Sequence, residues 1–303
     1  MASSCWGLPE TLCEFPSLPN KTLRHMRMGI DDGFRGIVRA YSDQIDAATR
    51  PLQWFLNMLE HAFVDTPWFI IFGLILVVVW FASRSAKIVI GSAIGLAMIG
   101  VFGLWEDTMT TLAMVTVATM IAIILGLPIG ILMARSDRMQ KILTPVLDVM
   151  QTMPSFVYLI PVVVIFGIGK VPGVIAVVIY AIPPMIRLTN LGIRLVDKEV
   201  IEAADAFGAN PRQKLWGVQL PLSLPTIMAG VNQTIMMALA MVVVASMVGV
   251  GGLGKNVLQA INNQFFTIGF LNGFALVAIA IIFDRASQAF GKRLQKHSEA
   301  GHD

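Results

Sequence analysis

Long apolar stretches recur along most of the chain after residue 67, and short polar or glycine-rich segments separate them. A helix needs about 17 to 25 predominantly apolar residues to cross the hydrocarbon core of a bilayer. Seven stretches reach or approach this length, so the pattern predicts an all-α polytopic membrane protein. The seven spans are expected at residues 68–82, 88–104, 108–134, 143–168, 171–188, 225–248 and 265–283.

Composition agrees with a membrane protein. Of the 303 residues, 56% are hydrophobic and only 14% are charged, and the mean hydropathy is +0.73. Such a chain has too little polar surface for a soluble globular protein. We expect the lipid bilayer to be its surroundings, and no nucleic-acid partner.

The basic residues lie mainly in alternate connections between the spans. Because Lys and Arg are enriched in cytoplasmic loops, these connections and the basic tail at residues 291–303 are expected inside the cell. With seven spans, the C-terminus is then cytoplasmic and the N-terminus is outside. The basic residues on the inner side are Arg84, Lys87, Arg135, Arg138, Lys141, Arg194, Lys198, Arg212, Lys214, Lys292, Arg293 and Lys296.

Residues 1–66 contain no spanning stretch and no signal-peptide pattern. Apolar residues recur at helical spacing over 37–63, which predicts one amphipathic helix that Pro51 interrupts or kinks. This helix either lies on the outer membrane interface or packs on the spans. Cys5 and Cys13, the only cysteines, lie in this tail, where an oxidising compartment permits a disulfide without requiring one.

The segment GVGGLGKN, residues 249–256, is close to the phosphate-binding signature G-x-x-x-x-G-K-[ST]. That signature needs a preceding strand and a terminal hydroxyl that holds magnesium, whereas Asn256 has no hydroxyl and an apolar membrane stretch precedes Gly249. Nucleotide binding by this chain is therefore not expected. The glycines instead allow the positive φ angles of a tight turn.

The sequence shows no cluster of nucleophile, base or metal ligands, so we expect neither an enzyme nor a metal site. An ion-coupled secondary carrier is the rival class, because such carriers use carboxylates near the middle of the membrane. The only intramembrane acids are Asp148 and Asp284, and both lie near cytoplasmic ends of spans. This position disfavours the carrier.

The longest inner loop, residues 197–222, has the pattern of two short helices. Asn210 is suited to an N-cap and Pro211 to the first helical position. Apolar residues can form one face of the first helix, with Phe207 at its end. An amphipathic loop of this kind is suited to docking a cytoplasmic partner.

This loop resembles the coupling loop of permease subunits of ATP-binding-cassette importers, which carries E-A-A, three residues, Gly, nine residues and I-x-L-P. Val218 stands in place of the isoleucine, the one departure. The resemblance implies that the loop docks on a separate ATPase subunit. The matching residues are Glu202, Ala203, Ala204, Gly208, Leu220 and Pro221, and Phe207 lies within the motif.

The resemblance also implies a type I importer architecture. A five-helix permease core is expected at residues 108–290, preceded by two accessory transmembrane helices at 67–107. Two ATPase copies would bind ATP and Mg, so this chain needs no cofactor of its own. A second copy of the chain and an external substrate-binding protein complete the expected complex in a bacterial inner membrane.

Residues 147–173, LDVMQTMPSFVYLIPVVVIFGIGKVPG, resemble the permeases for glycine betaine, proline and choline. The resemblance implies import of a small zwitterion or quaternary amine for osmotic protection. Histidine or carnitine is the alternative substrate.

The same stretch is expected to line the translocation pathway, because prolines free backbone carbonyls that are tolerated only against protein or water. Asp148 either lines this pathway or pairs with Arg194 or solvent. Met150, Met153 and Phe156 either form a soft constriction or pack in the core. The complete set of expected gate residues is Asp148, Met150, Gln151, Thr152, Met153, Pro154 and Phe156.

Overall fold

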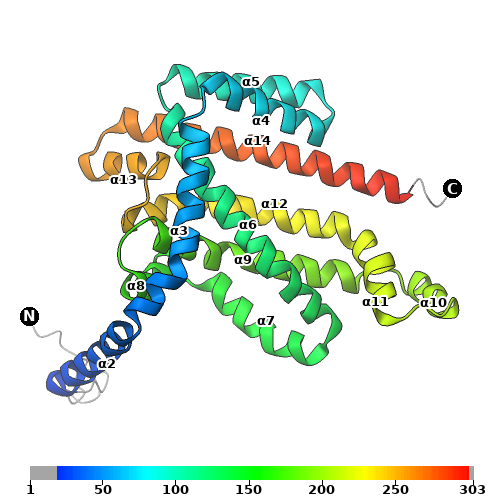
Figure 1. Ribbon diagram of the computed structural model, residues 1–303, viewed down its shortest axis with the longest axis horizontal. Coiled ribbons are helices and arrows are strands. Elements are labelled where there is room, and N and C mark those ends of the chain that lie inside the picture. The colour runs from blue at the N-terminus through cyan, green and yellow to red at the C-terminus, as the bar shows by residue number, and fades with distance from the viewer. Residues whose placement is uncertain (1–18, 300–303) are drawn as a thin grey trace, which may run out of the picture. The chain divides into compact units, whose positions relative to one another are not determined.

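The computed structural model describes residues 19–299, with side chains up to Arg293 (Figure 1). Cys5 and Cys13 lie outside the described residues. The chain divides into two compact units, residues 1–48 and 49–303, which are described separately. All regular elements in the described part are helices, as the all-α prediction requires.

Helix α2 (Asn20–Ala40) belongs to the first unit and is strongly amphipathic. Its apolar side chains recur every three or four residues, and none of them is buried. Of the two outcomes expected at Pro51, an interruption is wrong, because α3 (Ser42–Val64) continues through this residue and the helix breaks at Tyr41 instead. Ala47, whose carbonyl group loses its amide partner because residue 51 is proline, is exposed, so this carbonyl stays accessible.

In the second unit, the later part of α3 packs on the membrane helices. Leu52, Phe55, Leu59 and Phe63 are partly buried against the main hydrophobic core, and Leu56 is buried within it. The structure therefore supports the packing interpretation for this part of the predicted amphipathic helix.

The core is built around α6 (Trp105–Arg135), α9 (Lys170–Arg194) and α12 (Leu220–Ala245). Small residues let these helices approach closely, as in many membrane proteins. A Cβ at Gly130 of α6 would lie 2.6 Å from Thr189 Cβ of α9, and one at Gly192 would lie 3.0 Å from Thr226 Cβ of α12.

The predicted fourth span, residues 143–168, is not one helix. The chain bends by 101° between α7 (Asp137–Thr152) and α8 (Ser155–Phe166). Met153 and Pro154 both adopt extended backbone angles at the break. Proline disfavours helical geometry in the residue before it, and this explains why a continuous apolar stretch forms two helices.

When helices are judged by length and composition alone, the described part of the structure has fewer candidate spans than the seven that the sequence predicts. Among the described residues, four helices are long and apolar enough to cross a membrane singly, and up to six spans result if each bent pair counts as one. The pairs are α3 with α4 (Trp68–Ser83), and α7 with α8. The hairpin helices α4 and α5 (Ala86–Val101) have only 16 residues each, about 24 Å of helix.

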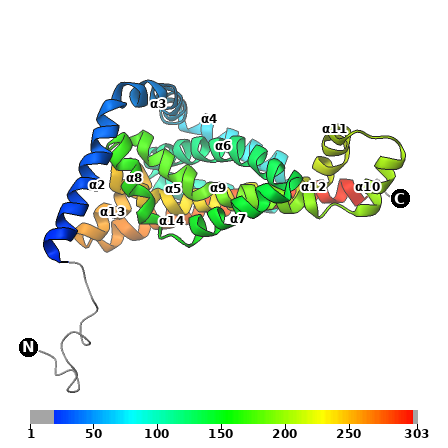
Figure 2. The same ribbon diagram turned by 90° about the horizontal axis from the view of Figure 1, so that it is seen from below.

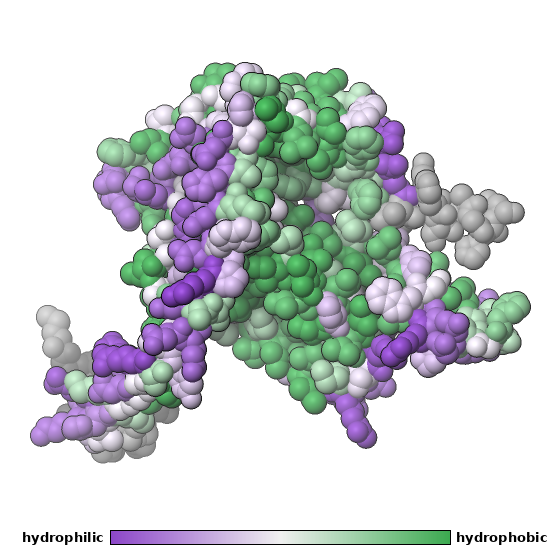
Figure 3. Space-filling model, in the orientation of Figure 1, coloured by the Kyte–Doolittle hydropathy of each residue, from purple (hydrophilic) through white to green (hydrophobic). Residues whose placement is uncertain are grey.

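The two ends of the second unit differ in character. Short helices α10 (Lys198–Ala206) and α11 (Pro211–Lys214) lie at one end, and α13 (Leu253–Asn263) lies at the other (Figures 1 and 2). Hydrophobic side chains cover much of the surface between these ends, while polar side chains gather near α10 and α11 (Figure 3). The last helix, α14 (Phe266–Glu299), passes beside α12 and the α4–α5 hairpin.

Candidate functional site

The predicted docking loop forms two helices that project beyond the core. Asp197 caps α10 by accepting a hydrogen bond from the Glu199 amide at 2.9 Å. Gly208 ends this helix with a φ of +76°, and its amide donates to the Asp205 carbonyl at 2.9 Å. Only glycine adopts such a φ without steric cost. The backbone conformation at the end of α10 therefore explains why the motif has a glycine at position 208.

The second half of the loop is joined firmly to the core. Asn210 and Gln213 form a reciprocal capping box at the start of α11, as the predicted N-cap requires. From Lys214 the chain continues through a π-helix (Leu215–Gln219) directly into α12. Because no non-helical segment separates α11 from α12, a displacement of α11 is expected to move this core helix as well.

The coupling-motif residues form an accessible surface. Phe207 is 92% exposed, although burying an aromatic side chain is normally favourable. Trp216, which sequence reasoning did not single out, is 69% exposed in the same loop. A Trp that closely follows the polar stretch PRQK of the predicted inner loop was the signal available in the sequence. Glu202, Ala203, Gly208 and Pro221 are also exposed, whereas Ala204 and Leu220 are half-buried.

The second group of predicted site residues surrounds the break between α7 and α8. Tyr158 is buried, and its hydroxyl donates a hydrogen bond to the Met150 carbonyl. The Thr152 hydroxyl donates to the Asp148 carbonyl at 3.0 Å. The first bond joins α8 to the last turns of α7 across the bend, and the second lies within the last turn of α7.

The Asp148 carboxylate forms an ion pair with Arg187 of α9, not with Arg194. Arg194 instead pairs with Asp137 at 2.8 Å and donates to the Met133 carbonyl at 3.1 Å. Each arginine thus joins α9 to a neighbouring helix. Asp148 remains 56% exposed, so its ion pair lies at the surface of the single chain.

The expected gate residues divide into two sets. Met150 and Met153 are partly buried against the core, which favours the packing interpretation for both. The remaining residues are exposed near the bend between α7 and α8. These exposed residues are Asp148, Gln151, Thr152, Pro154 and Phe156.

The GVGGLGKN segment has a structural role. Gly249 and Gly252 have φ angles of +93° and +85°, as a tight turn requires. Asn256 donates to the Asp107 carboxylate at 2.6 Å and to the Asn272 side-chain oxygen at 3.1 Å. These bonds tie α13 to α6 and α14, so the side chain at the position of a magnesium-binding hydroxyl is engaged within the fold.

The family described as the binding-protein-dependent transport system inner membrane component matches residues 126–296. GbuB, a glycine betaine/carnitine transport permease of Listeria monocytogenes, is 44% identical over 283 residues, which are 92% of this chain and 98% of GbuB. ProW, a glycine betaine/proline betaine permease of Escherichia coli, is 44% identical over 90% of this chain and 77% of ProW. OpuAB, a glycine betaine permease of Bacillus subtilis, is 47% identical over 69% of this chain and 73% of OpuAB.

A solved structure of the inward-facing MetNI methionine ABC transporter shares the fold. It matches 63% of this chain and 95% of its own chain, with a TM-score of 0.57 and 22% sequence identity. At this identity the likeness concerns architecture alone.

Proposed function

The chain belongs to the family of binding-protein-dependent transport system inner membrane components, and on that premise we propose that it imports a quaternary amine of the glycine betaine type. It is the permease subunit of an ABC importer, and a separate ATPase subunit binds the ATP. The names of GbuB, ProW and OpuAB, which all include glycine betaine, support the substrate class.

The observation that carries the coupling part of this proposal is the exposed loop of α10 and α11. Phe207 and Gly208 end α10 beyond the core, and α11 continues into α12. The ATPase subunit holds this loop at Glu202, Ala203, Ala204, Phe207 and Gly208, while Leu220 and Pro221 begin the helix that moves. Closure of the ATPase on ATP then moves α12 and the helices packed on it.

Two copies of the chain flank the passage, with one ATPase docked on each coupling loop. A two-fold pair is the commonest symmetric assembly, and each chain has one loop of this kind. The exposed residues beside the α7–α8 break, including Asp148, Gln151 and Phe156, face the partner copy across the pathway. An external binding protein delivers the substrate, so the passage itself needs no tight site.

The proposed domain arrangement follows from the same premise. Residues 1–66 form an extracytoplasmic tail, 67–107 two accessory helices, 108–290 the permease core with its coupling loop at 197–222, and 291–303 a basic cytoplasmic tail. The N-terminus is outside and the C-terminus inside. The positive-inside distribution of Lys and Arg supports this orientation.

The substrate proposal is tested by uptake of labelled glycine betaine into proteoliposomes that contain the permease, its ATPase and the binding protein. Uptake is expected to require all three components and ATP, with ADP as the control. Choline, carnitine and proline betaine should compete, because they share the quaternary ammonium group, whereas histidine should not. ATP-driven uptake of histidine without uptake of glycine betaine would overturn the substrate class.

A further inference from the structure

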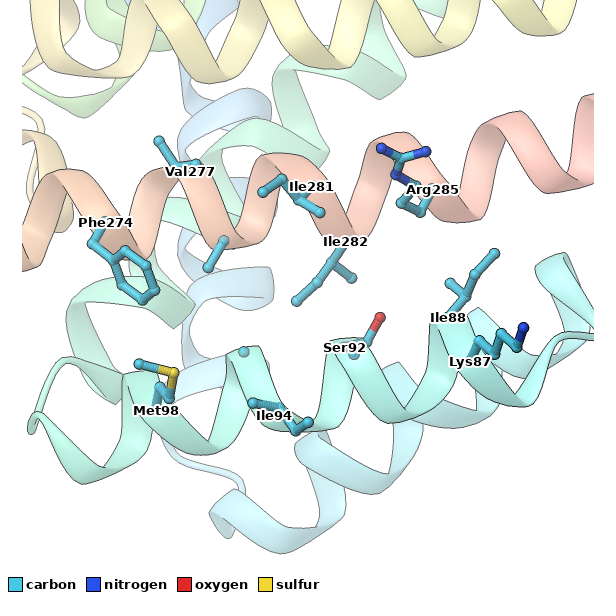
Figure 4. Close-up of a pocket in the computed structure, with 13 residues that line it drawn as sticks. Lys87, Ile88, Ser92, Ile94, Met98, Phe274, Val277, Ile281, Ile282 and Arg285 are labelled. Atoms are coloured by element: carbon cyan, nitrogen blue, oxygen red, sulfur yellow. The ribbon is translucent and has the colours of Figure 1, made fainter.

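An apolar groove lies between the accessory helix α5 and the last helix α14 (Figure 4). Its volume is about 450 Å³, within the ordinary range of small-molecule sites. The walls are aliphatic and aromatic, and Gly91 and Gly95 form part of the floor on α5. A Cβ at Gly91 would meet no atom within 4 Å. The groove opens to the surroundings, since Ile94, Val277 and Ile281 on its rim are more than half exposed.

Two cations stand at one end of this groove. Lys87 of α5 and Arg285 of α14 flank the same end, while Met98 and Phe274 lie at the other (Figure 4). No acidic residue lines the groove, and neither cation has a hydrogen-bond or ion-pair partner among residues 19–293. The neighbouring Asp284 turns toward α12, where it accepts a hydrogen bond from Asn232 at 3.0 Å.

The length of the groove matches one leaflet of a bilayer. Lys87 and Met98 are eleven residues apart on one helix, which corresponds to about 16 Å. Half of a typical hydrocarbon core is about 15 Å. The cationic end belongs to the side of the membrane where Lys and Arg gather, so the groove crosses the cytoplasmic leaflet from its headgroup level to the middle of the bilayer.

We propose that this groove binds an anionic phospholipid of the cytoplasmic leaflet. One acyl chain lies along α5 and α14, and Lys87 and Arg285 hold the phosphate. Basic pockets between membrane helices on the cytoplasmic side suit such headgroups. A packed helix is a poorer occupant, because its apolar face would cover Lys87 and Arg285 without supplying the negative charge that a phosphate offers.

This lipid would join the accessory α4–α5 hairpin to the permease core. The hairpin packs on α14 at Val79, Leu96 and Ile282, and Arg293 of α14 donates to the Phe81 carbonyl at the end of α4 at 2.7 Å. The groove lies on the opposite side of α5 from much of α4 (Figure 4). Lipid binding is therefore expected to add a second attachment between the hairpin and α14, independent of the transported substrate.

The charge arm of the test measures binding of phosphatidylglycerol and phosphatidylcholine to the purified full-length permease by native mass spectrometry. Wild type should prefer phosphatidylglycerol. The double variant Lys87→Gln/Arg285→Gln should bind it about 30-fold more weakly, since each surface cation near an anionic lipid contributes about fivefold. The matched control is Arg138→Gln/Lys141→Gln on α7, which removes two exposed cytoplasmic-side cations outside the groove and should leave the preference unchanged.

The apolar arm replaces Gly91 with leucine, which fills the groove while both cations remain. Gly91→Leu should lower phosphatidylglycerol binding at least tenfold, whereas Gly73→Leu on α4, another open helical position, should not. Glycerol 3-phosphate, which has the charge without the acyl chains, should not compete. Equal losses in the groove and control variants, or unchanged binding in both groove variants with an unaltered unfolding midpoint, would overturn the proposal.

Discussion

Lys214 of α11 forms an ion pair with Asp205 of α10, with 2.6 Å between Nζ and Oδ1. This contact joins the two halves of the loop, where α10 also packs near the π-helix Leu215–Gln219. The pair lies within the motif that carries the likeness to importer permeases. In the proposed docking, this ion pair lets α10 and α11 move as one body when the ATPase subunit contacts either helix.

Removal of this ion pair should weaken coupling modestly. The two side chains are 24% and 51% exposed, and an exposed pair of this kind contributes about 0.5 kcal/mol. Asp205→Asn is expected to lower ATP-driven glycine betaine uptake about twofold in proteoliposomes. The reversed pair, Asp205→Lys/Lys214→Asp, should restore it. Failure of the reversed pair to recover uptake would show that Asp205 touches the ATPase directly.

Gly208 should be sensitive to substitution because of its backbone conformation alone. A Cβ there meets nothing within 4 Å, but the φ of +76° costs a non-glycine residue about 1 to 2 kcal/mol. Gly208→Ala should therefore lower ATP-driven uptake by about 5- to 30-fold, and Gly208→Asn should lower it less, because Asn tolerates this region.

Gly217→Ala is the matched control for this position. Gly217 lies in the π-helix of the same loop, has open space around it and does not have a positive φ. Its substitution should leave uptake near wild type. Equal effects of alanine at both positions would exclude the backbone explanation.

Much of the architecture was predictable, because a membrane-spanning helix requires a long apolar stretch of sequence. The fifth, sixth and seventh predicted spans correspond to α9, α12 and α14, and the third to α6. The fourth corresponds to the bent pair α7 and α8 and not to one continuous helix, since apolarity persists through Met153 and Pro154 while the backbone turns. Hydropathy alone does not distinguish a continuous helix from a broken one, and Pro154 was the local signal for the break.

The coupling loop was predictable for a different reason, because its spacing is fixed by backbone chemistry. Asn210 caps a helix, Pro211 begins it, and Gly208 has the positive φ that ends the preceding one. The partner of Asp148 was not predictable. Arg187 lies 39 positions away, and only the packing of α7 on α9 brings it closer than Arg194.

The close contact of α6 with α9 should make Gly130 a stability determinant. A Cβ at Gly130 would lie 2.6 Å from Thr189 Cβ and 2.8 Å from the Ile186 carbonyl oxygen, so Gly130→Ala must push the helices apart. Overpacking of this kind costs about 1 to 3 kcal/mol. The midpoint of thermal unfolding in detergent should fall, while Gly73→Ala, at an open position on α4, should not lower it.

Asn256→Thr completes the phosphate-loop signature and therefore distinguishes a nucleotide-binding role of this segment from a structural one. If the GVGGLGKN segment had any nucleotide-binding character, the added hydroxyl should reveal it. We expect no ATP binding in equilibrium dialysis and a loss of about 1 to 3 kcal/mol of stability, because the contacts to Asp107 and Asn272 are lost. Measurable ATP binding by this variant would contradict the structural role.

The most direct measurement of the central claim places a photocrosslinking residue at position 207 and, separately, at position 259 in the complete complex. Phe207 ends α10, and Gln259 lies on α13 near the opposite end of the second unit. Irradiation is expected to join position 207 to the ATPase subunit and position 259 only to the substrate-binding protein. Capture of the ATPase from position 259, or of the binding protein from position 207, would contradict coupling through this loop.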